Sequence, residues 1–122
     1  MPSTADRHPT LFQSYAERAE HPSNTQLATY LLRLVHIKQT NLCVSADVTS
    51  SNELLRLAED VGDHICVLKT HADMIRGFGD KTIRGLNEIA RRKRFIVFED
   101  RKFMDIGSTW THSQAACCLF LC

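Results

Sequence analysis

The sequence predicts an α/β fold with a parallel sheet. Three short apolar segments, near residues 42–48, 64–70 and 94–99, have the length and composition of buried strands. Amphipathic helical patterns lie between them, so that strands and helices alternate along the chain. Strands that are joined through helices pair in parallel, and near-continuous apolar strands are typical of sheets covered on both faces. At 122 residues, the chain has room for one domain at most.

The first part of the chain, residues 1–24, is a polar segment that contains all three prolines. Within it we expect only a short helix, around Ser14 to His21. A longer helix follows, for which Asn24 and Thr25 are both candidate N-cap residues. Its apolar residues recur at helical spacing and are Leu27, Leu31, Leu34 and Val35.

The helix after the first strand begins with the pattern of a capping box, formed by Ser50 and Glu53. Gly62 is a natural stop for this helix. The predicted apolar stripe consists of Leu54, Leu57, Ala58 and Val61.

The helix after the second strand has Asp80 as its candidate N-cap. Its basic end, residues 91–94, has two interpretations. Positive charge is favourable at the negative end of a helix dipole, and the alternative is a patch that binds nucleic acid. The residues expected to face inward are Ile83, Leu86, Ile89 and Ala90.

The composition argues against several classes of protein. The net charge of +1 provides no strong field for nucleic acid or for a membrane surface, and we expect neither as a partner. No apolar run approaches the roughly 20 residues of a membrane-spanning helix. The N-terminus lacks the apolar core of a secretory signal, and none of the five cysteines forms a C-x-x-C pair. A cytoplasmic, reducing location is therefore expected.

Charged side chains follow each predicted strand. Asp47 ends the first, Lys69 and His71 end the second, and Asp100 and Lys102 follow the third. Because the carboxyl ends of parallel strands meet at one edge of a sheet, we expect these residues to converge. The cluster is either an acid–base site or a structural ion pair at a strand end. The first strand is not followed by a glycine-rich loop, which argues against a nucleotide-binding fold of that type.

Three segments carry a resemblance to a known family: S-A-D-V at 45–48, L-K-T-H at 68–71 and F-E-D-R-K-F-M-D-I-G-S-T at 98–109. Together they resemble orotidine 5′-phosphate decarboxylase of the fungal or eukaryotic type. The resemblance implies a (β/α)8 TIM barrel that works as a homodimer without metal or organic cofactor. It also implies the conversion of orotidine 5′-phosphate to UMP and CO2 in pyrimidine biosynthesis.

The same resemblance implies four catalytic residues. Lys102 corresponds to the lysine that delivers a proton to C6 of the pyrimidine, and Asp100 to the carboxylate near the carboxylate of the substrate. Lys69 and Asp105 complete an alternating array of lysines and aspartates, in which the last aspartate reaches across from the partner subunit. The acids hold the lysines charged and oriented.

Further residues are implied as contacts of the substrate. Asp47 and Lys69 correspond to contacts of the ribose. Thr70 and His71 lie in the same substrate-contacting motif, and Thr109 corresponds to a threonine that approaches the site of the partner.

The chain departs from the family in its extent. A TIM barrel typically needs about 250 residues, and this chain supplies about three of the eight strands. We expect a partial decarboxylase domain at 25–109 and an unrelated tail at 110–122, so that the phosphate-binding residues are absent. The alternative function is therefore a truncated, inactive fragment, produced by a shifted reading frame or a retained intron. A metal site in the tail is a further alternative, although its spacing fits no standard zinc pattern: His112, Cys117, Cys118 and Cys122.

Overall fold

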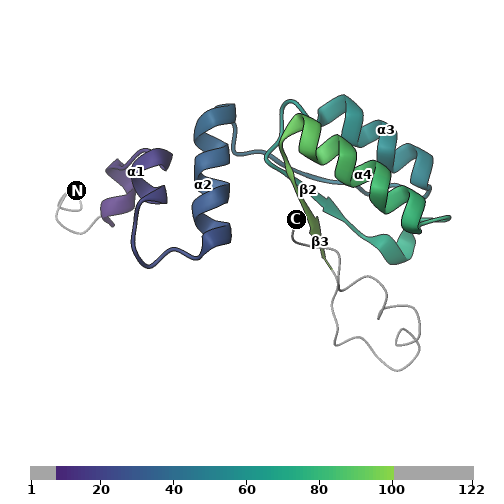
Figure 1. Cartoon of the computed structure of the whole chain (residues 1–122), viewed down its shortest axis with the longest axis horizontal. Helices are drawn as coiled ribbons and strands as arrows, with labels where there is room; N and C mark the ends of the chain where they lie inside the picture. Colours follow the sequence, from purple (N-terminus) through teal and green to yellow (C-terminus); the bar gives the residue numbers. More distant parts are fainter. Residues whose placement is uncertain (1–7, 101–122) are drawn as a thin grey trace, which may run out of the picture. The chain divides into compact units, whose positions relative to one another are not determined.

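The computed structural model describes residues 8–100 (Figure 1). The chain divides into two compact units, Met1–Asn41 and Leu42–Cys122. The predictions for Lys102, Asp105, Thr109 and the cysteine-rich tail lie outside the described residues.

The first unit is helical. A 3-10 helix, η2 (Pro9–Phe12), precedes α1 (Tyr15–Ala19) and α2 (Gln26–Lys38). Ser14 caps α1 through a complete capping box, in which its hydroxyl accepts the Glu17 N–H at 3.2 Å and the Glu17 carboxylate accepts the Ser14 N–H at 2.7 Å. Both predicted helices are therefore present.

The two candidate caps of α2 have different roles. The Thr25 hydroxyl accepts the N–H of Ala28 at 3.2 Å and is the N-cap. The Asn24 amide instead donates to the carbonyls of Arg18 and Ala19, at 2.7 and 3.3 Å, and so satisfies the C-terminal end of α1.

The predicted apolar face of α2 is only partly buried. Leu34 and Val35 are buried, but the side chain of Leu27 is 53% exposed. Within this unit α1 has five residues, and it is much shorter than the thirteen-residue α2.

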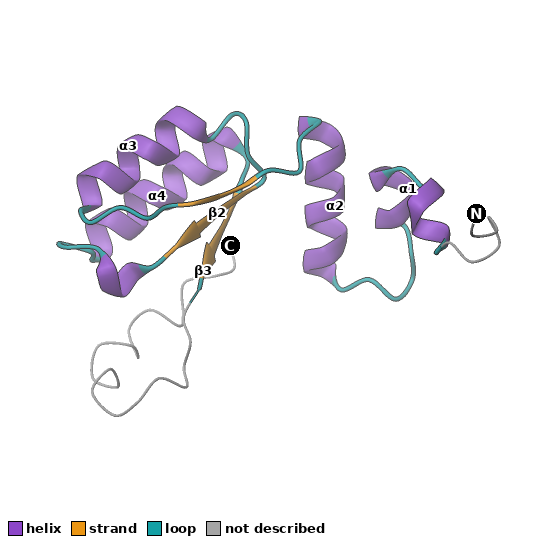
Figure 2. Cartoon of the chain, turned by 180° about the vertical axis from the view of Figure 1, so that it is seen from behind, coloured by secondary structure: helices purple, strands orange, loops and turns teal. Residues whose placement is uncertain are grey.

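The second unit contains the predicted parallel sheet. Its strands are β1 (Cys43–Ser45), β2 (Val67–Thr70) and β3 (Ile96–Glu99), in the order β1-β2-β3, and both pairings are parallel. The crossovers contain α3 (Ser51–Val61) and α4 (Asp80–Lys93), and a short 3-10 helix, η3 (Ala72–Met74), follows β2. Both helices pack on the same side of the sheet (Figure 2). The α/β fold with about three strand–helix units is confirmed.

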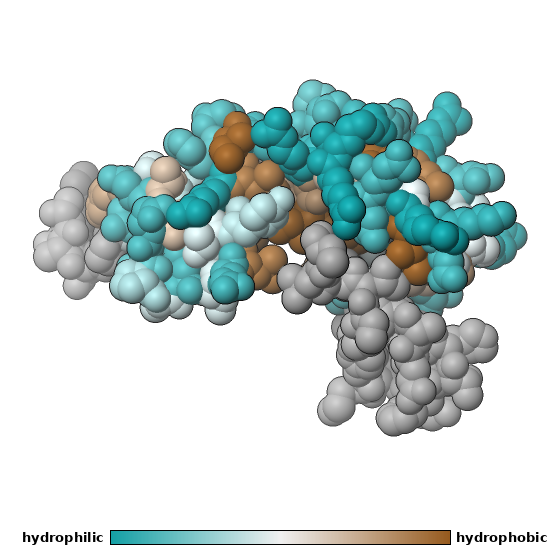
Figure 3. Space-filling model, in the orientation of Figure 1, coloured by the Kyte–Doolittle hydropathy of each residue, from teal (hydrophilic) through white to brown (hydrophobic). Residues whose placement is uncertain are grey.

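Residues alternate between the two faces of this sheet. On the helix side lie Ala46, Leu68 and Phe95, which are buried with the apolar stripes of α3 and α4. The outward surface of these helices is mainly polar, as expected of amphipathic helices (Figure 3). Among the described residues of the second unit no helix covers the opposite face, and Phe98 on it is 52% exposed. This open face carries the charged residues that end the strands.

The caps of the two crossover helices differ in detail from the prediction. Ser50 caps α3 by accepting the Glu53 N–H at 3.4 Å, but the Glu53 carboxylate accepts the N–H of Thr49, the residue before the cap, at 3.3 Å. The N-cap of α4 is Gly79, and Asp80 is the first helical residue. Asp80 still places an acid in the first turn, where the positive end of the helix dipole favours it.

Gly62 ends α3 for a reason that the sequence does not reveal. Its backbone is right-handed, with φ −56°, so a left-handed turn is not what requires glycine. A Cβ atom at this position would lie 2.5 Å from Cδ of Lys93 and 2.7 Å from the carbonyl oxygen of Ala58. The close approach of α4 therefore excludes a side chain here.

The basic run at 91–94 forms the end of α4, as the first of its two interpretations expects. Arg92 makes a two-pronged contact with Glu59 of α3, at 2.6 and 3.0 Å, and Lys93 contacts Asp63 at 2.5 Å. These ion pairs join the ends of the two helices. The contact with Arg92 lowers the pKa of Glu59.

Candidate active site

The open face of the sheet holds an ion pair between adjacent strands. The Lys69 Nζ of β2 lies 2.7 Å from the Asp100 Oδ2, directly after β3, and the two side chains are 32% and 34% exposed. The register explains the contact: Lys69 is aligned with Phe98, and Asp100 lies two residues further on the same face. The parallel arrangement thus brings together residues that the chain separates by a whole helix.

The ion pair changes the proton affinity of the lysine. The Asp100 carboxylate accepts a hydrogen bond from the ammonium group and so raises the pKa of Lys69 above its ordinary value. Partial desolvation opposes this effect, and the charge of Asp47 adds to it. Lys69 is therefore held as a cation at neutral pH.

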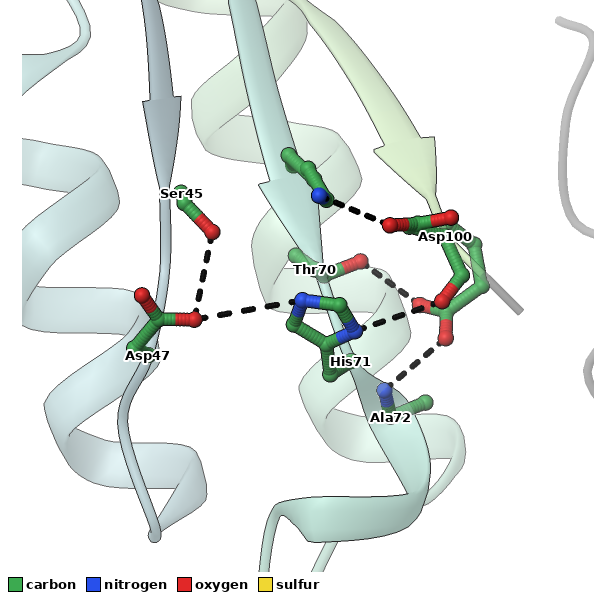
Figure 4. A network of polar contacts seen from close by, with 8 residues as sticks. Ser45, Asp47, Thr70, His71, Ala72 and Asp100 are labelled. Atoms are coloured by element: carbon green, nitrogen blue, oxygen red, sulfur yellow. Dashed lines mark hydrogen bonds and ion pairs between the residues drawn. The ribbon is translucent and has the colours of Figure 1, made fainter. Parts of the chain in front are cut away.

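His71 connects the outer strands of the same edge (Figure 4). Its Nδ1 donates to the backbone carbonyl of Asp100 at 3.2 Å, and its Nε2 lies 3.8 Å from the Asp47 Oδ1. The hydroxyl of Ser45 donates to the same Asp47 oxygen at 3.1 Å. The imidazole consequently spans the distance between the end of β1 and the end of β3.

Thr70 points to the opposite side of the sheet. Its side chain is 1% exposed and its hydroxyl donates to the Glu99 Oε2 at 2.7 Å. The Glu99 Oε1 accepts the N–H of Ala72 at 2.9 Å. The sequence prediction did not single out Glu99, although strand alternation places it opposite Asp100, on the covered side where a carboxylate needs partners.

The structure brings together part of the predicted set. Four of the predicted residues share the open face at the carboxyl end of the sheet: Asp47, Lys69, His71 and Asp100. The Thr70 side chain is not among them, and Lys102, Asp105 and Thr109 lie outside the described residues. The catalytic and substrate-binding roles of all these residues stay predictions.

No group of three or more His, Cys, Asp or Glu side chains within residues 8–100 is placed to hold a metal ion. No helix in this range is both long enough and apolar enough to cross a membrane. The metal-binding alternative for the tail concerns residues outside the range.

Known proteins resemble the chain closely. The model of the Orotidine 5′-phosphate decarboxylase / HUMPS family matches residues 40–117. The orotidine 5′-phosphate decarboxylase of Aureobasidium pullulans is 65% identical over 103 residues, which is 84% of this chain and 38% of that protein. The Candida glabrata enzyme of the same name is 51% identical over 79% of this chain and 36% of its own length. The uridine 5′-monophosphate synthase of Bos taurus is 49% identical over 79% of this chain and 20% of its own length.

A parallel sheet with helices on one side and charged residues at the carboxyl ends of its strands is typical of a barrel-type α/β enzyme. The chain belongs to the Orotidine 5′-phosphate decarboxylase / HUMPS family, and its fold is the N-terminal portion of a TIM barrel. The family resemblance predicted from the sequence is confirmed. The chain spans little more than a third of the length of the Aureobasidium pullulans relative. The domain boundaries at residues 24 and 109 stay predictions.

Proposed function

We propose that the chain supplies the N-terminal part of an orotidine 5′-phosphate decarboxylase, which converts orotidine 5′-phosphate to UMP and CO2. The Lys69–Asp100 ion pair is the observation that carries this proposal. It places a fixed cation and a carboxylate 2.7 Å apart on the open face of the sheet, at the edge where barrel enzymes build their sites. The identity of 65% to a relative of that name supports the same activity.

The chemistry needs these residue types. When the bond to the carboxylate carbon breaks and CO2 leaves, the electron pair remains on C6 of the pyrimidine. Fixed ammonium groups favour this developing charge, and Lys102 then delivers a proton to the carbon. Asp100, beside the substrate carboxylate, keeps the neighbouring lysines charged and oriented. The reaction needs no electron acceptor, because the pair stays on the carbon and is quenched by the proton.

The remaining roles follow the family pattern. Asp47 and Lys69 contact the ribose of the substrate, and His71 and Thr70 belong to the same binding segment. Asp105 and Thr109 reach the site of a second subunit, so the active form is a homodimer. The location is the cytoplasm, which is supported by the absence of a disulfide at Cys43 and Cys66, the two cysteines among the described residues.

The second candidate function is an inactive fragment of the same enzyme. It is favoured by the extent of the chain, which covers 38% of the Aureobasidium pullulans relative. In this case the chain retains the ion pair at the sheet edge but does not convert the substrate by itself. The two candidates differ in the activity of the isolated chain and share the same site residues.

The test uses a chimera, in which this chain up to Thr109 is joined to the part of the Aureobasidium pullulans relative that follows. We expect the chimera to form UMP from orotidine 5′-phosphate in vitro. We also expect it to restore growth without uracil to a host that lacks its own decarboxylase. A folded, dimeric chimera without turnover would contradict the proposed activity of these residues.

A further inference from the structure

Glu99 ties the end of β3 to the turn that follows β2. Its two carboxylate oxygens accept separate hydrogen bonds, one from the Thr70 hydroxyl at 2.7 Å and one from the Ala72 N–H at 2.9 Å. We call this arrangement of Glu99, Thr70 and Ala72 the Glu99 clasp. Thr70 is 1% exposed and Glu99 is half-buried, so water competes poorly for these hydrogen bonds.

The clasp lies where the regular pairing of the sheet ends. Thr70 and Glu99 are the last aligned pair of β2 and β3. One further backbone hydrogen bond, from the Asp100 N–H to the Thr70 carbonyl at 3.0 Å, extends the ladder. Beyond it the β2 chain turns into η3, so the clasp fixes the direction of the chain at this point.

The clasp also brackets the candidate active site along the chain. Lys69 directly precedes Thr70, His71 lies between Thr70 and Ala72, and Asp100 directly follows Glu99. Because neighbouring residues of a strand face opposite sides, a hydrogen bond on the covered side sets the position of the residues on the open side. The Glu99 clasp thus lies directly beside the residues that form the Lys69–Asp100 contact of 2.7 Å.

We propose that Glu99 is a positioning residue for decarboxylation, which acts from the covered side of the sheet to hold Lys69, His71 and Asp100 in register. This inference rests on the proposed function for its catalytic consequence. Its structural part, the control of the Lys69–Asp100 contact, stands on the described residues alone.

Two variants of Glu99 are informative because one keeps the hydrogen bonds of the side chain and the other removes them. Glu99→Gln has nearly the same shape, and its amide can accept from Ala72 N–H while donating to the Thr70 oxygen. Glu99→Ala removes both contacts and leaves the Ala72 N–H without this acceptor. In the chimera we expect Glu99→Ala to lower kcat on the order of 10²-fold with little change in KM, because a small misplacement of reacting groups is costly. Glu99→Gln should stay near the parent.

A second readout does not depend on activity. In the 122-residue chain labelled with [ε-13C]lysine, NMR titration follows the protonation of Lys69. We expect Glu99→Ala to move the pKa of Lys69 back toward its ordinary value, because Asp100 is no longer held against it. Glu99→Gln should retain the raised pKa.

The matched control is Glu59→Ala, which also removes a carboxylate, but one whose partners are Arg92 and Lys93 at the other end of the helices. It should leave kcat and the titration of Lys69 unchanged. If Glu99→Ala does not fold, Thr70→Val removes one arm of the clasp and should move the same titration in the same direction.

Three results would overturn the inference. The first is an unchanged pKa of Lys69 in folded Glu99→Ala, or in Thr70→Val if Glu99→Ala does not fold. The second is a folded Glu99→Gln chimera whose kcat falls as much as that of Glu99→Ala. The third is an equally large fall of kcat in Glu59→Ala. A parent chimera without turnover would refute the proposed function separately, and the titration would still decide whether the clasp controls the ion pair.

Discussion

Lys69 and Asp100 form an ion pair of 2.7 Å across two parallel strands, although α4 separates them along the chain. The contact follows from the register, which aligns Lys69 with Phe98, because Asp100 lies two residues after Phe98 on the same face of the sheet. An ion pair that is one-third exposed adds little to stability by itself. Its placement on the open face, together with His71 and Asp47, favours a role in the chemistry over a purely structural one.

We predict that Asp100→Asn in the chimera lowers kcat by about 10²-fold or more, because the variant removes the carboxylate that keeps the neighbouring lysines charged and oriented. The pKa of Lys69 should fall at the same time, since the carboxylate that raises it is gone. Steady-state kinetics and NMR titration measure the two effects. Asp60→Asn, an exposed position on α3, is the control and should change neither quantity.

We predict that Lys102→Ala in the chimera removes nearly all turnover while the thermal unfolding midpoint and the dimer stay unchanged. A proton donor acts in the transition state, so kcat should fall far more than substrate affinity. Lys81→Ala, an exposed lysine of α4, should retain full activity. A Lys102→Ala enzyme with near-normal kcat would reject the assigned role.

We predict that Gly62→Ala destabilises the second unit by about 1–3 kcal/mol, the usual cost of overpacking. The added Cβ would meet Lys93 Cδ at 2.5 Å and the Ala58 carbonyl at 2.7 Å. Gly79→Ala is the control, because nothing lies within 4 Å of its added Cβ and its φ of −170° suits any residue. Denaturant unfolding should show a loss for the first variant that clearly exceeds that of the second.

We predict that Glu53 makes the free energy of unfolding depend on pH in the acidic range. The N–H of Thr49 donates to its carboxylate and lowers the pKa of Glu53 below its ordinary value. A group whose pKa is lower in the folded state stabilises the fold above the unfolded pKa, and this stability is lost as the pH falls through the folded pKa. Glu53→Gln should therefore be less stable than the parent at pH 7, with the difference closing below about pH 4. A difference in stability between the parent and Glu53→Gln that is the same at both pH values would show that the charge of the Glu53 carboxylate is not its cause.

Much of the second unit was predictable from the sequence. The strands and α3 depend on local sequence patterns. They were therefore predictable from the lengths of the apolar segments, from the apolar periodicity and from the serine at position 50. The role of Gly62 was not predictable in this way, because it depends on a contact with Lys93 on another helix. Leu27 of the first unit fits a helical stripe but is half exposed, because periodicity does not report how much surface a neighbour covers.

The candidate site shows the same limit. The acids and bases that end the strands were predicted to converge because parallel strands share an edge, and Asp47, Lys69 and Asp100 lie there. Glu99 was overlooked because its partners, Thr70 and the Ala72 N–H, come from another strand and from the backbone. Alternation along β3 was the available signal, since it sends Glu99 and Asp100 to opposite faces.

We predict, finally, that the 122-residue chain alone has no measurable orotidine 5′-phosphate decarboxylase activity. Difficult reactions draw on binding energy from remote parts of the substrate, and the phosphate is the obvious handle here. The described residues form three strands, whereas a closed TIM barrel has eight, so the open face lacks the walls that exclude water from a site. The chain should be purified from a host without its own decarboxylase and assayed for UMP beside the chimera. Turnover by the isolated chain, abolished by Lys102→Ala, would show that the N-terminal part is sufficient for catalysis and would reject the inactive-fragment alternative.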